Sequence, residues 1–489
     1  MTAISTSQYL KDVLPQQPFI STATNIIEKT ERWICAHPTT VKIVEWLAIT
    51  GGFLAIACLP LTFPAIGFGA IALAVVGGII GSIAFLAYRR LDFLIPPSHA
   101  IAQHAFKETA HEGTRLYYAG DIPILEIKEG ATPYQAGYAH GYLLGDKIEK
   151  IRERYQAAAS DLSELPKAED LPLVLSEIKK LLPPEYVEEL NGLVEGFNAW
   201  AKTCWFKPKA ATLEELLRLH LIPDSIHFNE MTAEEGLKPQ PVVACTAILN
   251  KDKDGHVIFA RNMDWQSLGL FGTYTLVTQR PGGIYSVGLP GLIGTVTGMK
   301  KSGLSLAMNV CSGQTQKING MPAIFYNRHC LENCDTVDAV DDYVTKYLPL
   351  GAYHLTVADA SKATSFHLHQ GDTKETHFLK RELEKDPLIV TNCHYAKKDG
   401  VISSLHGKID FHGSFAREEI LTKFFADAQE KIATDKVDML SLMEKSTALP
   451  YVNNLMTTHR IVMLPAQGVM KVSFDNAWAG DVDLQTINL

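Results

Sequence analysis

The 489-residue sequence predicts an α+β protein in which a mostly helical segment precedes a strand-rich segment. Before residue 245, apolar residues recur at helical spacing, most clearly over residues 184–196. After residue 245, apolar and polar residues alternate, and turns rich in proline, glycine or lysine separate the alternating runs. A long uncharged stretch sets the first 90 residues apart from both segments. These three observations define the regions discussed below.

The uncharged stretch is residues 46–88, which contain no Asp, Glu, Lys or Arg over 43 positions. Pro60 and Pro64 divide it into two lobes, each about as long as the roughly 17–25 residues of a membrane span. A proline-marked turn between two apolar helices is typical of a hairpin that enters and leaves a membrane on the same side. The alternative is a buried helical hairpin in a soluble core. We expect a transmembrane helical hairpin over residues 46–90, after a polar lead of residues 1–45.

Basic residues flank this hairpin on both sides, including Lys42 before it and Arg89-Arg90 after it. By the positive-inside rule, both flanks and the rest of the chain should lie on the cytoplasmic side of the membrane. The stretch begins too late to be a secretory signal, and no cleavage site follows it. A double-lobed hairpin ahead of a soluble domain resembles membrane-inserted effector proteins of intracellular bacteria. If this protein is such a secreted bacterial protein, the membrane would be that of a host.

The segment from residue 91 to residue 244 is expected to be mostly helical. Thr132-Pro133 supply an N-cap and a first-turn proline for a helix reaching about residue 155, and residues 117–127 alternate like one strand. His140 on this helix is either a catalytic base or, more simply, a side chain that fills a groove opened by neighbouring glycines. Pro239 and Pro241 should keep the last residues of the segment extended and exposed.

The next feature is a cysteine on a predicted β-hairpin. A strand beginning at Cys245 is followed by an Asp254-Gly255 turn and by a return strand that ends near Arg261. The hairpin therefore brings Arg261 and Asp264 back beside Cys245. A cation and a carboxylate next to a thiol are what a nucleophilic cysteine requires. The alternative is a buried core cysteine, since unpaired cysteines are among the most buried residues.

Further strands and helices follow this hairpin and alternate along the rest of the chain. Strands are predicted at residues 273–279, 284–288, 293–297, 304–310, 355–359, 364–369 and 388–392, and helices at residues 327–331 and 336–346.

Composition excludes several classes of function. The formal net charge of −9 and the lack of a basic run argue against nucleic-acid binding. Eight cysteines are few for this length and show no disulfide framework, which favours a reducing compartment. His329-Cys330 with Cys334, and Cys393-His394, do not have the spacing of a zinc module. We therefore expect no metal site and no cofactor.

The segment from Cys245 onward reads Cys-Thr-x-hydrophobic, a turn with glycine, then Arg-Asn-x-Asp before an aromatic residue. This pattern resembles the N-terminal-nucleophile cysteine hydrolases, which include acid ceramidase, N-acylethanolamine-hydrolysing acid amidase, bile salt hydrolase and the penicillin acyl-CoA acyltransferases. The resemblance implies an αββα sandwich over residues 245–489, preceded by a helical pro-segment, residues 91–244, and the transmembrane hairpin. It also implies self-cleavage between Ala244 and Cys245, which would leave an α/β heterodimer.

The resemblance assigns a role to each remaining site residue. Arg261 would bias Cys245 toward thiolate and Asp264 would orient the new α-amine. Asn392, at the end of a predicted strand, would donate its amide N–H to the oxyanion, although it could simply cap that strand. A backbone N–H at Asn309 would be the other oxyanion donor. Arg417 falls where relatives place a second arginine that closes the site, or it is a surface arginine at a helix start.

These roles imply an enzyme that cleaves a linear amide through a thioester. The membrane hairpin favours an N-acyl lipid as the substrate, and a small-molecule amide is the other option. An amine acceptor in place of water would make the same site an acyltransferase, although the acyltransferase branch carries Gln where Arg261 stands. The alternative from another class is a membrane-anchored interaction protein with a degenerate enzyme domain.

Overall fold

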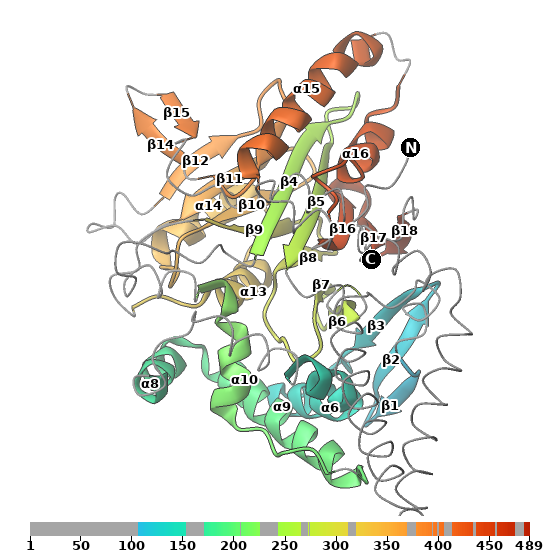
Figure 1. Cartoon of the computed structure of the whole chain (residues 1–489), viewed down its shortest axis with the longest axis vertical. Helices are drawn as coiled ribbons and strands as arrows, with labels where there is room; N and C mark the ends of the chain where they lie inside the picture. Colours follow the sequence, from blue (N-terminus) through green and yellow to red (C-terminus); the bar gives the residue numbers. More distant parts are fainter. Residues whose placement is uncertain are drawn as a thin grey trace, which may run out of the picture. The chain divides into compact units, whose positions relative to one another are not determined.

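Figure 1 shows the computed structural model of the chain. All the residues that the structure describes lie in the unit Ser98–Leu489. They are residues 106–152, 171–205, 207–224, 243–265, 272, 274–311, 319–368, 378–393, 395–398, 401–404, 413–433, 437–454, 457–474 and 484–489. The polar lead and the expected transmembrane hairpin lie outside the described residues. Within the described ranges, no helix is long and apolar enough to span a bilayer.

Two β-sheets form the centre of the described part. The larger sheet has the strand order β1-β2-β3-β6-β7-β8-β9-β10-β11-β12, and all its pairs are antiparallel except β3 with β6. The smaller sheet has the order β13-β4-β5-β16-β17-β18 and is antiparallel throughout. A separate hairpin pairs β14 with β15.

The strands have the following bounds: β1 Thr109–His111, β2 Thr114–Ala119, β3 Ile122–Glu126, β4 Val243–Lys251, β5 Val257–Trp265, β6 Leu276–Arg280, β7 Ile284–Gly288, β8 Thr297–Lys300, β9 Ser305–Val310, β10 Tyr353–Ala358, β11 Ala363–Leu368, β12 Phe378–Glu382, β13 Leu388–Val390, β14 Tyr395–Lys398, β15 Val401–Ser404, β16 Thr457–Leu464, β17 Val469–Ser473 and β18 Gln485–Asn488. The helices are α6 Pro133–Leu143, α8 Leu171–Leu181, α9 Pro184–Thr203, α10 Leu213–His220, α13 Ala323–Asn333, α14 Val337–Lys346, α15 Ser414–Ala433 and α16 Met439–Thr447, with a 3₁₀ turn η1 at Pro465–Gln467.

The alternating side chains of the strands fill three apolar layers. One layer lies between the sheets and includes Phe259, Val287 and Met463. A second joins the outer face of the smaller sheet to α15 and α16, which lie over β4 and β5 in Figure 1. The third joins the outer face of the larger sheet to α13, α14 and the helices of the pro-segment. The described part is therefore layered helix–sheet–sheet–helix, and the predicted α+β class is confirmed.

Helices α6 and α9 approach so closely that their backbones touch. A Cβ atom on Gly137 would lie 1.9 Å from the carbonyl oxygen of Glu189 on α9. The groove at the glycines of α6 is thus filled by the α9 backbone, so the expectation that His140 fills it is wrong. His140 is buried, and its Nε2 accepts a hydrogen bond from the N–H of Gly291 at 2.9 Å. Burial lowers the pKa of His140 to about 3, which keeps its ring neutral.

Two strand predictions need correction. The single strand expected at residues 117–127 is a hairpin, because Gly120 has φ +63° and turns the chain between β2 and β3. Strands β1 to β3 join the larger sheet, so the pro-segment is less helical than expected. The strand expected at residues 293–297 starts only at Thr297. The residues before it pack on α13, where the N–H of Thr295 bonds the carbonyl of Ile324 at 2.8 Å.

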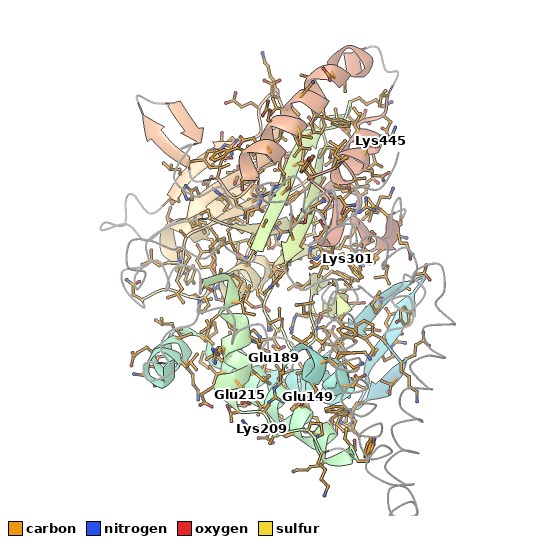
Figure 2. The ribbon with its side chains drawn as sticks, in the orientation of Figure 1. Glu149, Glu189, Lys209, Glu215, Lys301 and Lys445 are labelled. Atoms are coloured by element: carbon orange, nitrogen blue, oxygen red, sulfur yellow. The ribbon has the colours of Figure 1, made fainter. Side chains whose placement is uncertain are left out.

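A buried ion network links the pro-segment to the strand-rich segment. Glu189 on α9, labelled in Figure 2, accepts from Arg280 of β6 and from Arg328 of α13, both at 2.7 Å. Burial alone would raise the pKa of Glu189, but the two guanidinium groups outweigh it and hold that pKa below its usual value. Since removal of one partner from a buried pair is costly, this network holds the two segments together.

Candidate active site

The site is built on the β4–β5 hairpin that the sequence predicts. Its turn is fixed by Asp252, whose Oδ1 accepts the backbone N–H groups of Asp254 and His256, and by Gly255 at φ +82°. The strands pair Cys245 with Met263 and Ala244 with Asp264. The end of β5 therefore lies beside the start of β4, as predicted.

The two predicted partners of Cys245 lie on opposite faces of this hairpin. Cys245 and Arg261 belong to the face turned toward the larger sheet, because Ala247, which pairs with Arg261 and shares a face with Cys245, packs in the layer between the sheets. Thr246 and Asp264 belong to the face covered by α15 and α16, since Ile248 on the same face packs against those helices. The cation thus faces the thiol on one side of the sheet, whereas the carboxylate lies on the other.

Arg261 holds the sulfur of Cys245. Its Nη2 donates to Sγ at 3.3 Å, and its Nη1 donates to the side-chain oxygen of Asn309 at 3.2 Å and to the carbonyl of Met308. Asn309 in turn donates from Nδ2 to the carbonyl of Val390 at 2.9 Å. Arg261 and Asn309 are fully buried. The Asn309 side chain therefore fixes the Arg261 guanidinium that contacts Cys245. The oxyanion role expected of the Asn309 backbone N–H remains a prediction.

Arg417, in the first turn of α15, holds the main chain at Cys245 from the opposite face. Its Nη1 donates to the carbonyl oxygen of Cys245 and, at 2.7 Å, to Oγ1 of Thr246. Its Nη2 donates to Oδ1 of Asn392 at 3.0 Å, and Nη1 lies 4.0 Å from Oδ2 of Asp264. Only 1% of Arg417 is exposed, so the alternative of a surface arginine is wrong. Arg417 therefore links the Asp264 carboxylate to Cys245.

Asn392 contacts the third polar group of Cys245, its backbone N–H. It follows β13, which pairs with β4, and its Oδ1 accepts the backbone N–H of Cys245 at 2.8 Å. Its Nδ2 donates to the carbonyl of Val310 at 2.6 Å. The amide orientation is set by this network, because a flipped amide would turn its NH₂ toward the donors from Cys245 and Arg417. The second hydrogen on Nδ2 is the one that the predicted oxyanion role requires.

Asp264 is positioned by a residue that sequence reasoning missed. Thr457 donates from Oγ1 to Oδ1 of Asp264 at 2.7 Å, at a point where the pairing of β16 with β5 shifts register. The two residues are 193 positions apart, and no motif marks Thr457. Thr246, the other missed residue, stands in the Cys-Thr pair that carries the family resemblance, so the motif could have identified it.

The thiol of Cys245 is held neutral in the intact chain. Burial raises its pKa above the usual cysteine value. Arg261, Arg417 and a hydrogen bond from the Asp264 backbone lower this pKa, whereas the Asp264 carboxylate raises it. The effect of burial is larger than that of the two arginines, so the pKa of the thiol stays raised. The intact site therefore surrounds Cys245 with polar contacts without converting its thiol to thiolate.

The peptide bond predicted to break lies within the sheet. Ala244 is fully buried and pairs with Asp264, because β4 already begins at Val243. The expectation that the chain is exposed up to the cysteine is therefore wrong at Ala244. Pro239 and Pro241 lie outside the described residues. Any attack on the Ala244 carbonyl would take place in a buried position, away from bulk water.

Comparison with known proteins finds a family similarity over part of the chain. Residues 250–416 match the family model described as acyl-coenzyme A:6-aminopenicillanic acid acyl-transferase. The matched segment contains four predicted site residues, Arg261, Asp264, Asn309 and Asn392, and ends one residue before Arg417. The match confirms the predicted resemblance to the N-terminal-nucleophile cysteine hydrolases and supports amidohydrolase or acyltransferase chemistry.

Two solved structures were also found to be similar. The N-acylethanolamine-hydrolyzing acid amidase ortholog of Caenorhabditis elegans is 17% identical, with a TM-score of 0.36 over 50% of this chain and 100% of that one. A mutant of the conjugated bile acid hydrolase from Clostridium perfringens is 14% identical, with a TM-score of 0.34 over 50% of this chain and 92% of that one. No match was found among curated proteins.

Proposed function

We propose that this protein is a membrane-tethered, self-cleaving cysteine amidohydrolase that cleaves a linear amide, such as an N-acyl lipid, through a thioester on Cys245. One observation carries the proposal. Each polar atom of Cys245 has its own buried partner: Sγ contacts Arg261, the N–H contacts Asn392 and the carbonyl contacts Arg417. A core cysteine needs none of these contacts, whereas a nucleophile that must be held in one geometry needs all of them.

Self-cleavage comes first in this proposal. The Cys245 thiol gives up its proton as Sγ forms a bond to the carbonyl carbon of Ala244, and the peptide nitrogen leaves with a proton. The product is a thioester between Ala244 and Cys245, with a free amine on Cys245. Water then attacks the thioester, which releases Ala244 as a carboxylate and restores the thiol. Arg261, within 3.3 Å of Sγ, stabilises the developing thiolate.

Turnover then uses the amine that cleavage creates. An unperturbed α-amine has a pKa of about 7.7–8.0, so it accepts the thiol proton near neutral pH. The side-chain oxygen of Asn392 accepts the Cys245 N–H in the intact chain, and we propose that it would accept one hydrogen of this amine after cleavage. The thiolate attacks the substrate carbonyl, and the second Nδ2 hydrogen of Asn392 stabilises the oxyanion. The carbon–nitrogen bond of the substrate then breaks, and its amine leaves with the proton held by the Cys245 amine. Water completes the hydrolysis of the acyl-enzyme.

The two products of self-cleavage are proposed to remain associated as an α/β heterodimer. The Glu189 network, with Arg280 and Arg328, spans the two segments, and the apolar layer on the larger sheet includes side chains from both. Tethering is proposed through residues 46–90, whose uncharged stretch would place the site near lipid substrates on the cytoplasmic side of a membrane.

An acyltransferase is the second candidate function, and the matched family description favours it. The same thioester would then be attacked by an amine in place of water. Arg261 argues for hydrolysis, since the acyltransferase branch carries Gln at that position. An inert interaction protein is the least supported alternative, because the full set of contacts at Cys245 is retained.

The deciding experiment is N-terminal sequencing and intact mass of the purified protein. We expect two fragments, of 244 and 245 residues, with the second starting at Cys245. Cys245→Ala should remain one chain, whereas Cys330→Ala, which removes a buried cysteine of α13, should still be processed. An uncleaved wild-type chain would contradict self-cleavage. Release of fatty acid from an N-acyl amide, with and without added hydroxylamine, then separates hydrolysis from acyl transfer.

A further inference from the structure

A second cluster of reactive side chains lies between the two sheets, on the larger one. Cys311 follows β9 directly, His354 is in β10 and His367 is in β11, three strands that are neighbours in the sheet. His354 and His367 are directly opposite each other in the pairing of β10 with β11. One ligand atom from each of the three residues lies within 4.8 Å of the others, and all three side chains are buried.

These distances are close to those of a zinc site. With Zn–S near 2.3 Å and Zn–N near 2.0–2.1 Å, a tetrahedral ion holds its ligand atoms about 3.3–3.6 Å apart. The three atoms in the structure therefore need to move together by no more than about 1–1.5 Å. Small changes in side-chain torsion supply that movement.

A hydrogen bond fixes the tautomer of one of the two rings. Nε2 of His354 lies 2.7 Å from the carbonyl oxygen of Cys393, so Nε2 carries the proton and donates it. The lone pair of the neutral ring is then on Nδ1. A backbone carbonyl that fixes the tautomer of a histidine in this way is a common outer contact of a zinc ligand. The His354 and His367 rings also lie together, with centroids 4.7 Å apart.

We propose that Cys311, His354 and His367 bind a zinc ion with three protein ligands, leaving a fourth position for water. Thiolate and imidazole ligands select borderline-soft ions such as Zn²⁺ over Mg²⁺ or Ca²⁺. Binding releases the thiol proton of Cys311 to solvent. The cluster combines strands from residues 311 to 367, so no short sequence motif could have indicated it. The proposal departs from the expectation, drawn from sequence spacing, that the chain has no metal site.

The position of the site suggests what the ion does. His354 pairs in register with Asn309 on one side and bonds the carbonyl of Cys393 on the other. Asn392 precedes Cys393 in the chain, and Asn309 contacts Arg261. An ion on this cluster would therefore stiffen the two segments that position the Cys245 contacts. The binding site stands without the proposed enzyme function, whereas this positioning role rests on it.

The test uses the full chain carrying Cys245→Ala, so that the nucleophile cannot itself bind metal. Titration with Co²⁺ should saturate at one ion per chain and produce a thiolate-to-metal charge-transfer band in the near ultraviolet. Zn²⁺ should displace the Co²⁺ and raise the melting temperature. Cys311→Ser should abolish the band, and His367→Gln should weaken binding by more than about tenfold. Cys330→Ser, a buried cysteine outside the cluster, is the matched control and should bind normally.

Three results would overturn the proposal: no charge-transfer band, a band that survives in Cys311→Ser, or a band lost equally in Cys330→Ser. Circular dichroism reports whether each variant is folded. If Cys311→Ser does not fold, folded His367→Gln decides, because unchanged Co²⁺ affinity in that variant excludes the imidazole as a ligand. Self-cleavage of the wild-type Cys245 chain is measured separately, so failure of the metal site and failure of the enzyme proposal give different results.

Discussion

The hydrogen bond from Thr457 to Asp264 gives a sharp test of the site, because Thr457→Val removes it with little change in shape. Oγ1 and Oδ1 are 2.7 Å apart, and both residues are buried. A hydrogen bond to a charged group contributes about 1.5–3 kcal/mol, so the variant should lose that much folding stability. Valine suits a strand, which preserves β16. If the oriented carboxylate also supports the attack by Cys245, the same energy slows self-cleavage by about 10–100-fold.

The assay follows the uncleaved chain over time on a denaturing gel, with chemical denaturation for stability. Thr457→Ser retains the hydroxyl and should process like wild type. Thr458→Val is the matched control on the same strand: it removes a neutral bond to the carbonyl of Met263 at 3.2 Å. It should cost about 0.5–1.5 kcal/mol of stability and leave processing unchanged. The reasoning is refuted if Thr457→Val processes at the wild-type rate, or if both valine variants slow processing equally.

Three more predictions follow from buried groups. Arg417→Lys should slow self-cleavage at least about tenfold, since one ammonium group cannot reach all the acceptors that the guanidinium group bonds. The exposed Arg115→Lys is its control, and equal processing of both variants would contradict the role of Arg417 at the site. Gly192→Ala would place Cβ 2.1 Å from a carbonyl oxygen of α6 and should cost about 1–3 kcal/mol by thermal melting, whereas the exposed Asn191→Ala should cost almost nothing. Burial raises the pKa of Asp224 to about 8, so from about pH 4 to pH 8 the folded chain keeps a proton that the unfolded chain has lost. Asp224 therefore lowers the free energy of unfolding by about 1.4 kcal/mol for each unit that the pH rises in this range. Asp224→Asn should make the melting temperature less dependent on pH, and a pH dependence equal to that of the wild type would contradict this.

Elements set by local chemistry could be predicted from the sequence. Strand β7 has the predicted bounds, because turn residues flank it on both sides. Helix α14 begins where Thr336 was expected to start it, and the Thr336 side chain accepts the N–H of Ala339. The β4–β5 hairpin is also local, so the proximity of Arg261 to Cys245 could be read directly.

Elements set by contacts across the fold could not be predicted. Strand β8 begins later than expected because the residues before the strand bond to α13, which lies further along the chain. The hairpin predicted that Asp264 lies near Cys245, but not that the two face different layers or that Arg417 connects them. Thr457 and the Cys311 cluster depend on strand register between distant segments. In each case the missing information was which distant strands and helices are neighbours.

The proposed self-cleavage would activate the site while the contacts of Arg417 and Asn392 with Cys245 stay in place. Arg417 and Asn392 bond the carbonyl and the nitrogen of Cys245, and both atoms remain on Cys245 when the bond to Ala244 breaks. What changes is the nitrogen, which turns from an amide that cannot accept a proton into an amine that can. Burial raises the pKa of the Cys245 thiol in the intact chain, and the proposed departure of Ala244 would supply a base beside that thiol. Under the proposed function, the intact peptide bond would therefore be the inactive state, and its hydrolysis would create the missing catalytic group in place.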